Sequence, residues 1–362
     1  MRLRPYLNKV KVYVRGRTTL AAAAVNVYAL EKSEDAICPP SIFLENEFDK
    51  VIAVQGETTF DVERCRITGG PTTHAPLKRY EFKDAFIFDN GLCVSEGTFL
   101  RYGRLPHREI LTKSVHELDK AVFCAAPPSM RYFGHWLMES CCTALLQRDN
   151  EDLILPTPAN WPDTKSYVDY FDFKPAQGSV FRVKNASLYE DFAQGQSHRA
   201  RYGELRRRLR QKFPDENGRG KRFYLKRGPA GAVRHCVNEA AIIERLQKDG
   251  FEVLDIEKES IENVLRRGMD ADLIVTMEGS NQAHGVLMLR ERGLLVAIQP
   301  ADRFSAVYRG RTAAMNIEYG FVVAEKANNE GGYRLDEDAL MRTLDLYTIP
   351  AHTAGSGIIA AQ

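Results

Sequence analysis

The sequence predicts an α/β protein of about two domains, and three observations support this. The chain has 362 residues, which is more than one ordinary domain of roughly 150 residues uses. Between residues 222 and 299, apolar segments of strand length alternate with amphipathic segments of helix length, a pattern typical of a parallel sheet covered by helices on both faces. The first 125 residues contain short strand-like runs separated by turn signals such as Asp89-Asn90-Gly91, so we expect a β-rich first half with irregular loops.

The composition excludes several classes of protein. Apolar residues make up 44% and charged residues 27% of the chain, which excludes disordered and fibrous proteins. The 50 basic and 48 acidic residues leave a net charge of only +2, so the general basic field of a nucleic-acid-binding protein is missing. The seven cysteines form no C-x-x-C pair, which argues against a zinc ribbon and favours a reducing, cytosolic setting. No apolar run reaches the length of about 18 residues that a membrane span needs, and we expect no signal peptide.

The first half is expected to contain short strands and one amphipathic helix. The strand-like segments are Lys50–Val54, Ala85–Phe88, Ala121–Ala125 and Asp152–Leu155. From Trp136 to Leu145 apolar residues recur at helical spacing, so a helix is predicted to begin near Gly134.

The second half is expected to alternate strands with helices. Strands are predicted at Arg222–Lys226, Phe251–Ile256, Asp272–Met277 and Leu294–Gln299. Helices are predicted at Asn238–Lys248, Ser260–Arg267, Gln282–Arg292 and about Asp336–Tyr347. Asn238 and Ser260 are the expected N-caps of their helices.

A basic stretch separates the two halves. Arg199–Arg227 contains 12 Lys or Arg residues against 3 Asp or Glu residues, and it includes the flexible-looking run from Asp215 to Gly220. We therefore predict one domain over residues 1–205, a second over 215–330, and a C-terminal helix and tail over 331–362.

Two polar segments follow strands of the second half, where ligands bind in open α/β sheets. Lys226, Arg227 and Arg234 flank a glycine-containing loop, and guanidinium groups suit phosphate oxygens. This segment is either a diphosphate clamp or a solvated basic loop.

The second segment follows the most apolar strand and opens a helix. It contains Glu278, Gly279, Ser280 and Asn281, and Ser280 and Asn281 are expected to cap the helix. Free amides at such a helix start attract an anion, and Glu278 suits the hydroxyls of a sugar; the alternative is an ordinary N-capped helix. The run Gln299–Phe304 either closes the same crevice or is a plain turn, and the plain turn is favoured.

His135 and Glu139 are four residues apart, so they share one helix face. A histidine with a neighbouring carboxylate suits a general base that takes a proton from a hydroxyl. The alternative is a histidine of the core. A metal site is disfavoured because no third ligand is spaced nearby.

Taken together, these segments resemble the family 61 glycosyltransferases. Phe133–Glu139 is similar to the H-W-x-x-E segment of that family. Tyr224–Arg227, Arg234 and Asn238-Glu239 are similar to its R…R…N-E signature, and Ala271–Val275 with Glu278-Gly279-Ser280 is similar to its strand and phosphate loop. The motifs agree in order over roughly residues 84–299. One departure is that many relatives read H-G-A-G where this chain has Glu278 to Asn281.

The resemblance implies a GT-B-like architecture of two facing Rossmann-like domains, with the acceptor side in the first and the nucleotide sugar in the second. It implies an inverting transfer without a metal ion or another cofactor. His135, oriented by Glu139, would be the base. Lys226, Arg227, Arg234, Glu278, Gly279, Ser280 and Asn281 would bind the donor and its phosphates.

The implied acceptor is a saccharide, or its lipid-linked precursor, in bacterial capsule or polysaccharide biosynthesis. The protein would be cytoplasmic, and the basic stretch either contacts the inner membrane peripherally or is a solvated helix face. Three alternatives stay open, namely a non-catalytic nucleotide-sugar-binding subunit, a nucleotide-sugar epimerase or sugar-phosphate transferase, and a disfavoured nucleic-acid binder. The sequence indicates neither the donor sugar nor the oligomeric state.

Overall fold

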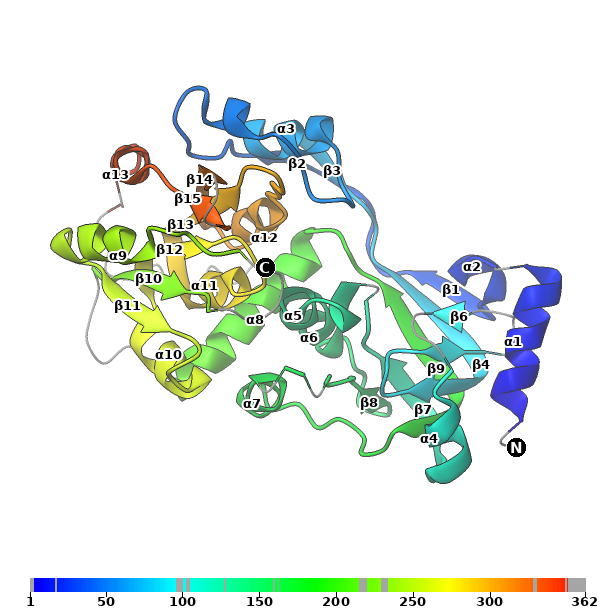
Figure 1. Ribbon diagram of the computed structural model, residues 1–362. Helices are drawn as coiled ribbons and strands as arrows, with labels where there is room; N and C mark the ends of the chain where they lie inside the picture. Colours follow the sequence, from blue (N-terminus) through cyan, green and yellow to red (C-terminus); the bar gives the residue numbers. More distant parts are fainter. Residues whose placement is uncertain are drawn as a thin grey trace, which may run out of the picture.

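The computed structural model contains two large sheets and a two-stranded hairpin (Figure 1). It describes residues 3–350 except 17, 96–99, 102–104, 127, 159, 162, 215–219, 229–233, 328–330 and 349. The predicted loop Pro229–Val233, most of the predicted linker and the tail beyond Pro350 lie outside the described residues. The chain is thus an α/β protein with several sheets, as expected.

The helical segments of the first half are α1 (Arg4–Arg15), α2 (Leu20–Ala23), η1 (Glu47–Lys50), α3 (Phe60–Thr68), α4 (His107–Thr112), η2 (Pro128–Met130), α5 (Phe133–His135), η3 (Trp136–Ser140), α6 (Cys141–Ala144), α7 (Asp163–Tyr170) and α8 (Gln196–Lys212). Those of the second half are α9 (Glu239–Lys248), α10 (Ile261–Gly268), α11 (Gln282–Met288), α12 (Tyr308–Ala314) and α13 (Glu337–Asp345).

The strands of the first half are β1 (Asn26–Ala29), β2 (Glu34–Cys38), β3 (Gly70–His74), β4 (Lys78–Phe88), β5 (Cys93–Val94), β6 (Leu100–Arg101), β7 (His116–Phe123), β8 (Asp152–Ile154) and β9 (Val180–Glu190). Those of the second half are β10 (Arg222–Lys226), β11 (Glu252–Asp255), β12 (Ala271–Met277), β13 (Leu289–Pro300), β14 (Glu318–Lys326) and β15 (Tyr333–Arg334).

The second sheet has the strand order β11-β10-β12-β13-β14-β15. The pairs from β11 to β14 are parallel, and β15 pairs antiparallel with β14. The chain runs outward from β10 to β11 and then returns to β12 on the other side of β10. This reversal places a topological switch point between β10 and β12, and in such sheets the crevice outside the carboxyl ends of those two strands is the usual ligand site.

Alternate residues of the second sheet bury into two different cores, because successive side chains of a strand point to opposite faces. Leu273 and Val275 pack with α9 and α13, whereas Ile274 and Leu295 pack with α10 and α11. Both faces are therefore covered by helices, which confirms the expectation from the apolar strands.

The first sheet is mixed and not doubly wound. Its order is β6-β5-β4-β9-β7-β8, with β1 paired to β4. β4 pairs antiparallel with β1, β5 and β9, and β5 pairs antiparallel with β6. β7 pairs parallel with β8 and with β9. The first half is thus β-rich, but its sheet departs from the Rossmann-like pattern that the resemblance implied.

A segment of the first half lies against the second sheet, as Figure 1 shows for α3 beside α12 and β14. The buried carboxylate of Glu47 accepts the amide of Val323 at 2.7 Å, and that of Glu63 accepts the amide of Ala306 at 2.7 Å. The predicted strand Lys50–Val54 is wrong, because Lys50 ends the 3-10 turn η1 and only Val54 forms a bridge, to Phe304. The division at about residue 210 stays a prediction.

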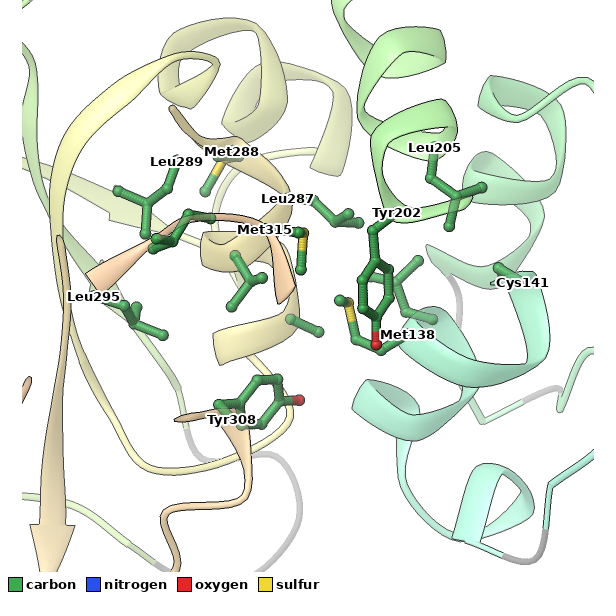
Figure 2. Close-up of a cluster of buried hydrophobic side chains, with 14 of the residues drawn as sticks. Met138, Cys141, Tyr202, Leu205, Leu287, Met288, Leu289, Leu295, Tyr308 and Met315 are labelled. Atoms are coloured by element: carbon green, nitrogen blue, oxygen red, sulfur yellow. The ribbon is translucent and has the colours of Figure 1, made fainter. Parts of the chain in front are cut away.

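The helix α8 joins the two halves and carries much of the basic stretch. Tyr202 and Leu205 pack between Met138 of the first half and Leu287 of the second (Figure 2). Two of its arginines, Arg201 and Arg206, are buried. Arg206 donates to the carbonyl oxygens of Leu289 and Met315.

Other arginines of α8 are paired. Arg201 forms an ion pair with Asp191, and Arg210 one with Asp270. The interpretation of this stretch as a solvated helix face is therefore wrong for the buried Arg201 and Arg206, whereas Arg207 is exposed and Arg199, Arg208 and Arg210 are partly exposed. The pairing also weakens the interpretation of the stretch as a membrane contact.

Most predicted elements of the second half are confirmed within one or two residues, and two boundaries are wrong, because β13 begins at Leu289 and not at Leu294. The helix expected over Gln282–Arg292 ends at Met288, because Leu289 is extended and pairs with Ala271 at the start of β13. Pairing within the sheet outweighs the helical pattern of these residues.

Candidate active site

His135 and Glu139 lie on the helix that crosses from the first sheet toward the second. This helix begins as α5, becomes the π-helix η3 and continues as α6. Inserted π-helical turns are frequent at functional sites. The Nδ1 atom of His135 lies 2.8 Å from Oε1 of Glu139, as the four-residue spacing predicted.

Arg311 of α12 completes this pair from the second half of the chain. Its Nη2 atom donates to Oε1 of Glu139 at 2.6 Å. Burial by itself would raise the pKa of Glu139, but the hydrogen bond with His135 and the charge of Arg311 outweigh it and lower the pKa to about 2. Glu139 is therefore ionised near neutral pH.

Two neighbours of His135 act on the same ring nitrogen. Glu139, which only accepts, lies 2.8 Å from Nδ1, and Nη2 of Arg311, which only donates, lies 3.1 Å from it. The shorter contact, with an ionised carboxylate, favours a proton on Nδ1. In the neutral ring Nε2 is then the atom with the free lone pair. The side chain of His135 keeps 23% of its surface exposed, whereas Glu139 and Arg311 keep 8% and 5%. His135 is thus an accessible base supported by a buried ion pair.

Gly134 brings the histidine helix against the loop that follows β12. A methyl group at Gly134 would lie 3.2 Å from the Cα atom of Ser280 and would overlap the hydroxyl of Tyr308. Burial raises the pKa of Tyr308, and the charges of Arg311, Glu278 and Glu139 act on the same hydroxyl. Tyr308 therefore lies between the histidine cluster and the carboxyl edge of the second sheet.

We predict that Gly134→Ala destabilises the protein by about 1–3 kcal/mol, the usual cost of adding volume to a packed site. Thermal unfolding should show this loss, and transfer activity should fall because the histidine helix is displaced from Ser280. Gly134→Ala combined with Tyr308→Phe should recover part of the stability, since the phenol oxygen is then absent. An unchanged melting temperature for Gly134→Ala would contradict the close packing.

A pocket of about 280 Å³ opens at the switch point of the second sheet. Lys226 and Arg227, at the end of β10, line it together with Arg234 and Met277, and Glu239 at the start of α9 supplies a carboxylate. Lys226 lies 3.8 Å from that carboxylate. The structure thus brings the three predicted cations of the clamp into one pocket.

Glu278 is the counter-charge of several arginines at this edge. It forms an ion pair with Arg234, and burial raises its pKa although the charges of Arg234, Arg303 and Arg227 oppose that rise. Burial and the charge of Arg234 lower the pKa of Arg227. The charge of Glu257 also acts on Arg227, so three guanidinium groups share two carboxylates at this edge. Arg303 belongs to the turn after β13, so this turn lies near the crevice, and whether it closes the crevice stays a prediction.

The loop after β12 is shaped by Gly279 and Asn281. Gly279 has a φ of +150°, and a methyl group there would lie 2.9 Å from Nε of Arg227. Asn281 makes no side-chain cap, contrary to the prediction, and its amide donates to the Met277 carbonyl at 3.2 Å and to Thr276 at 2.5 Å. Asn281 therefore holds the loop on β12, and its role in donor binding stays a prediction.

Three of the amides expected to be free at the start of α11 are paired. The amides of Gln282, Ala283 and His284 donate to the carbonyl oxygens of Gly279, Ser280 and Asn281. That the amides near Ser280 attract an anion stays a prediction.

Two further polar residues of the predicted motifs are structural. Asn238 does not cap α9 with its side chain and instead binds the backbone of Leu335. His284 stacks on Phe133 and contacts the hydroxyl of Tyr167, and burial lowers its pKa to about 4. His284 is thus a packed core histidine.

Tyr308 and Arg311 were not found from the sequence. They lie on a helix of the second half, about 170 residues after the histidine that they support, and no local motif marks them. The only signal was their helical spacing of three, which a surface helix shows equally well.

Among the described residues, no cluster of three or more His, Cys, Asp or Glu side chains is placed to hold a metal ion. Two D-x-D triplets occur, Asp270–Asp272 and Asp336–Asp338. The first precedes and begins β12, away from its carboxyl end, and its carboxylates pair with Arg210 and Arg290. Asp336 caps α13. No helix of the described chain is long and apolar enough to cross a bilayer.

A partly exposed histidine thus lies on the helix that packs against the loop after β12, and a pocket lined by Lys226, Arg227 and Arg234 opens at the switch point of the sheet. This edge is the usual ligand site of such a sheet. The family model described as Glycosyltransferase 61 matches residues 133–295, from the start of α5 into β13. The protein carries a domain similar to this family and is a glycosyltransferase. A search among curated proteins gives no significant match.

Proposed function

We propose that the protein transfers a sugar from a nucleoside diphosphate donor to a saccharide hydroxyl, with inversion and without a metal ion. The contact of the His135 helix with the Ser280 loop supports this most directly. That contact joins the histidine to the edge of the sheet where the arginines gather. The acceptor belongs to a cell-surface polysaccharide or its lipid-linked precursor.

The reaction is a single displacement. Nε2 of His135 takes the proton of the acceptor hydroxyl, and the oxygen forms a bond to the anomeric carbon. The bond from that carbon to the phosphate oxygen breaks, and the nucleoside diphosphate leaves with the electron pair on the opposite side. Arg227, Arg234 and Lys226 neutralise the charge that develops on the diphosphate.

The arrangement is a variant of the GT-B type in this proposal. Two sheets with a site between them support it, although the first sheet is mixed. The seven cysteines form no disulfide bond, which supports a reducing, cytoplasmic location. The paired arginines of α8 leave little free charge for a peripheral membrane contact.

The donor pocket is tested by Arg227→Ala. A charge-assisted hydrogen bond contributes about 1.5–3 kcal/mol, so the affinity for the preferred nucleoside diphosphate should fall by roughly ten- to a hundredfold. Calorimetric titration after a thermal-shift panel of nucleoside diphosphates, with and without EDTA, measures this. Arg222→Ala is the matched control, because Arg222 lies at the other end of β10 and is exposed. Equal losses in both variants, or a requirement for a divalent ion, would reject the proposed pocket.

A further inference from the structure

A second polar pocket lies on the first sheet, apart from the donor pocket. It has a volume of about 230 Å³ and is lined by residues of β4, β7, β9 and the loop before β8. Lys120 of β7 is paired with Asn185 of β9, and Ser187 of β9 is paired with Glu81 of β4. Alternate residues of a strand share a face, so these strands present one continuous polar surface to the pocket.

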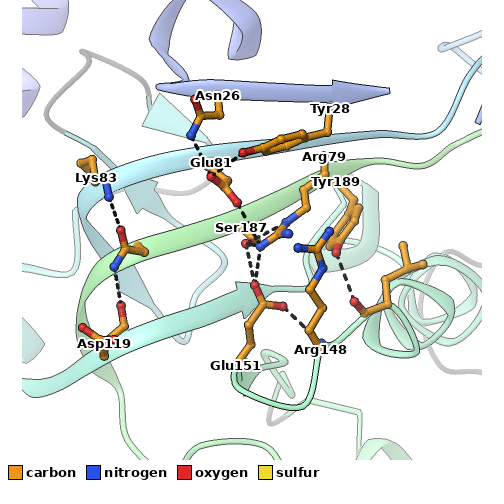
Figure 3. Close-up of polar contacts among 12 residues, drawn as sticks. Asn26, Tyr28, Arg79, Glu81, Lys83, Asp119, Arg148, Glu151, Ser187 and Tyr189 are labelled. Atoms are coloured by element: carbon orange, nitrogen blue, oxygen red, sulfur yellow. Dashed lines mark hydrogen bonds and ion pairs between the residues drawn. The ribbon is translucent and has the colours of Figure 1, made fainter. Parts of the chain in front are cut away.

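Arg79 forms the floor of this pocket. It is 5% exposed, and its Nη2 atom donates to Ser187 and to Glu151, both at 2.6 Å (Figure 3). Its Nη1 atom is buried and has no partner among the described residues. A buried donor without an acceptor is costly and in native proteins marks the place of a water, an ion or a ligand.

The two carboxylates of the pocket are occupied by internal donors. Glu151 accepts from Arg79 and Ser187 through Oε1 and from the amide of Arg148 through Oε2. Glu81 pairs with Arg79 through Oε1 at 3.3 Å, and its Oε2 atom accepts from Asn26 and Tyr28. Neither carboxylate is left to neutralise a further cation.

Two other cations of the pocket have no such partner. Figure 3 shows the side chain of Arg148 extending toward Arg79, and the charges of both arginines act on the hydroxyl of Tyr189. Within the described part of the chain, the guanidinium of Arg148 and the ammonium of Lys120 form no ion pair. Arginine and lysine side chains only donate, so a ligand of this pocket must supply acceptors.

We propose that this pocket is a second ligand site, which binds a carboxylate or phosphate group between Arg79, Arg148 and Lys120. Three cations against two occupied carboxylates give the pocket a net positive charge. Guanidinium groups that converge on one space match the oxygens of such anions. An acidic sugar of the acceptor chain and a phosphate-bearing ligand share this chemistry.

The site is independent of the proposed transfer reaction. It shares no lining residue with the donor pocket. Along the helix from His135 to Ala144 the chain rises by roughly 13 Å. Arg148 follows the end of this helix, away from the base. A failure of one site in an experiment therefore leaves the other unaffected.

The test titrates inorganic phosphate and glucuronate into the full-length Arg227→Ala protein, in which the donor pocket is weakened. Arg148→Gln should lower the affinity for the better probe at least tenfold, and Lys120→Gln should lower it several-fold. Arg245→Gln is the control, because Arg245 is exposed on α9. The melting temperature of Arg148→Gln should match that of the parent, since its guanidinium forms no described contact.

The relative affinity of the probes identifies the source of the anion. Tighter binding of glucuronate assigns the pocket to an acidic sugar, and tighter binding of phosphate assigns it to a phosphate group. The proposal is overturned if neither probe binds saturably, or if Arg148→Gln and Arg245→Gln bind both probes equally well.

Discussion

Replacement of His135 by alanine should slow sugar transfer by about 10²–10⁴-fold, the usual contribution of a general base, and leave donor affinity within a factor of about two. The ring supplies Nε2 to the acceptor, whereas the donor phosphates meet arginines of another element. Glu139 keeps its ion pair with Arg311 in this variant, so the fold is retained.

His135→Gln sharpens this test. Its amide still donates to Glu139 but has no basic nitrogen, so it should be as slow as the alanine variant. Steady-state kinetics with one donor and one acceptor measure the rate, and calorimetry with the nucleoside diphosphate measures the binding. His107→Ala is the control, since His107 is exposed on α4. Transfer at the normal rate by either His135 variant would show that another group is the base.

Arg311→Met should lower the free energy of unfolding by about 3–5 kcal/mol, because it leaves the buried carboxylate of Glu139 without its counter-charge. Chemical denaturation measures the loss. The exposed pair Lys248–Glu244 is the control, and Lys248→Met should cost less than about 0.5 kcal/mol. The double variant Glu139→Gln/Arg311→Met should be more stable than Arg311→Met alone, since no buried charge remains.

The pH dependence provides an independent measurement of the same pair. The pKa of Glu139 is lowered from 4.5 to about 2. Its contribution to stability is therefore present above about pH 4.5 and is lost as the pH falls through 2. The difference between wild type and Arg311→Met should shrink over that range, because protonation removes the charge that Arg311 neutralises. A difference below about 1 kcal/mol at neutral pH, or one that does not change with pH, would contradict the role of this ion pair.

The strands and helices of the second half up to β13 were predictable because their signals are local, whereas α12, β14 and β15 were not predicted. The strand at Arg222–Lys226 has the predicted bounds, and Ser260 caps α10 as expected by accepting the amide of Asn263. The error at Met288 arose where sheet pairing between Ala271 and Leu289 outweighs a helical pattern. In the first half, Lys50–Val54 was wrongly predicted as a strand, because Lys50 ends the turn η1 and only Val54 forms a bridge, to Phe304 of the second half.

The candidate site also has features that the sequence predicted and features that it did not. The pairing of His135 with Glu139 followed from helical spacing, and the gathering of Arg227, Arg234 and Glu278 followed from the position of their loops after neighbouring strands. The caps expected from Asn238 and Asn281 were wrong, because each side chain binds backbone of another segment. A cap is decided by which partner lies closer in space, and the sequence does not contain that distance.

By itself the sequence determined the α/β class and the parallel sheet of the second half, and it predicted which histidine and arginine segments are candidates for the site. These depend on spacing along the chain, and spacing is fixed by helix and strand geometry. Only the tertiary structure decided that Arg311 and Tyr308 meet His135 and that Arg79 and Arg148 face one pocket. Such contacts join residues far apart in the chain, and they exist because a continuous core packs the two halves together.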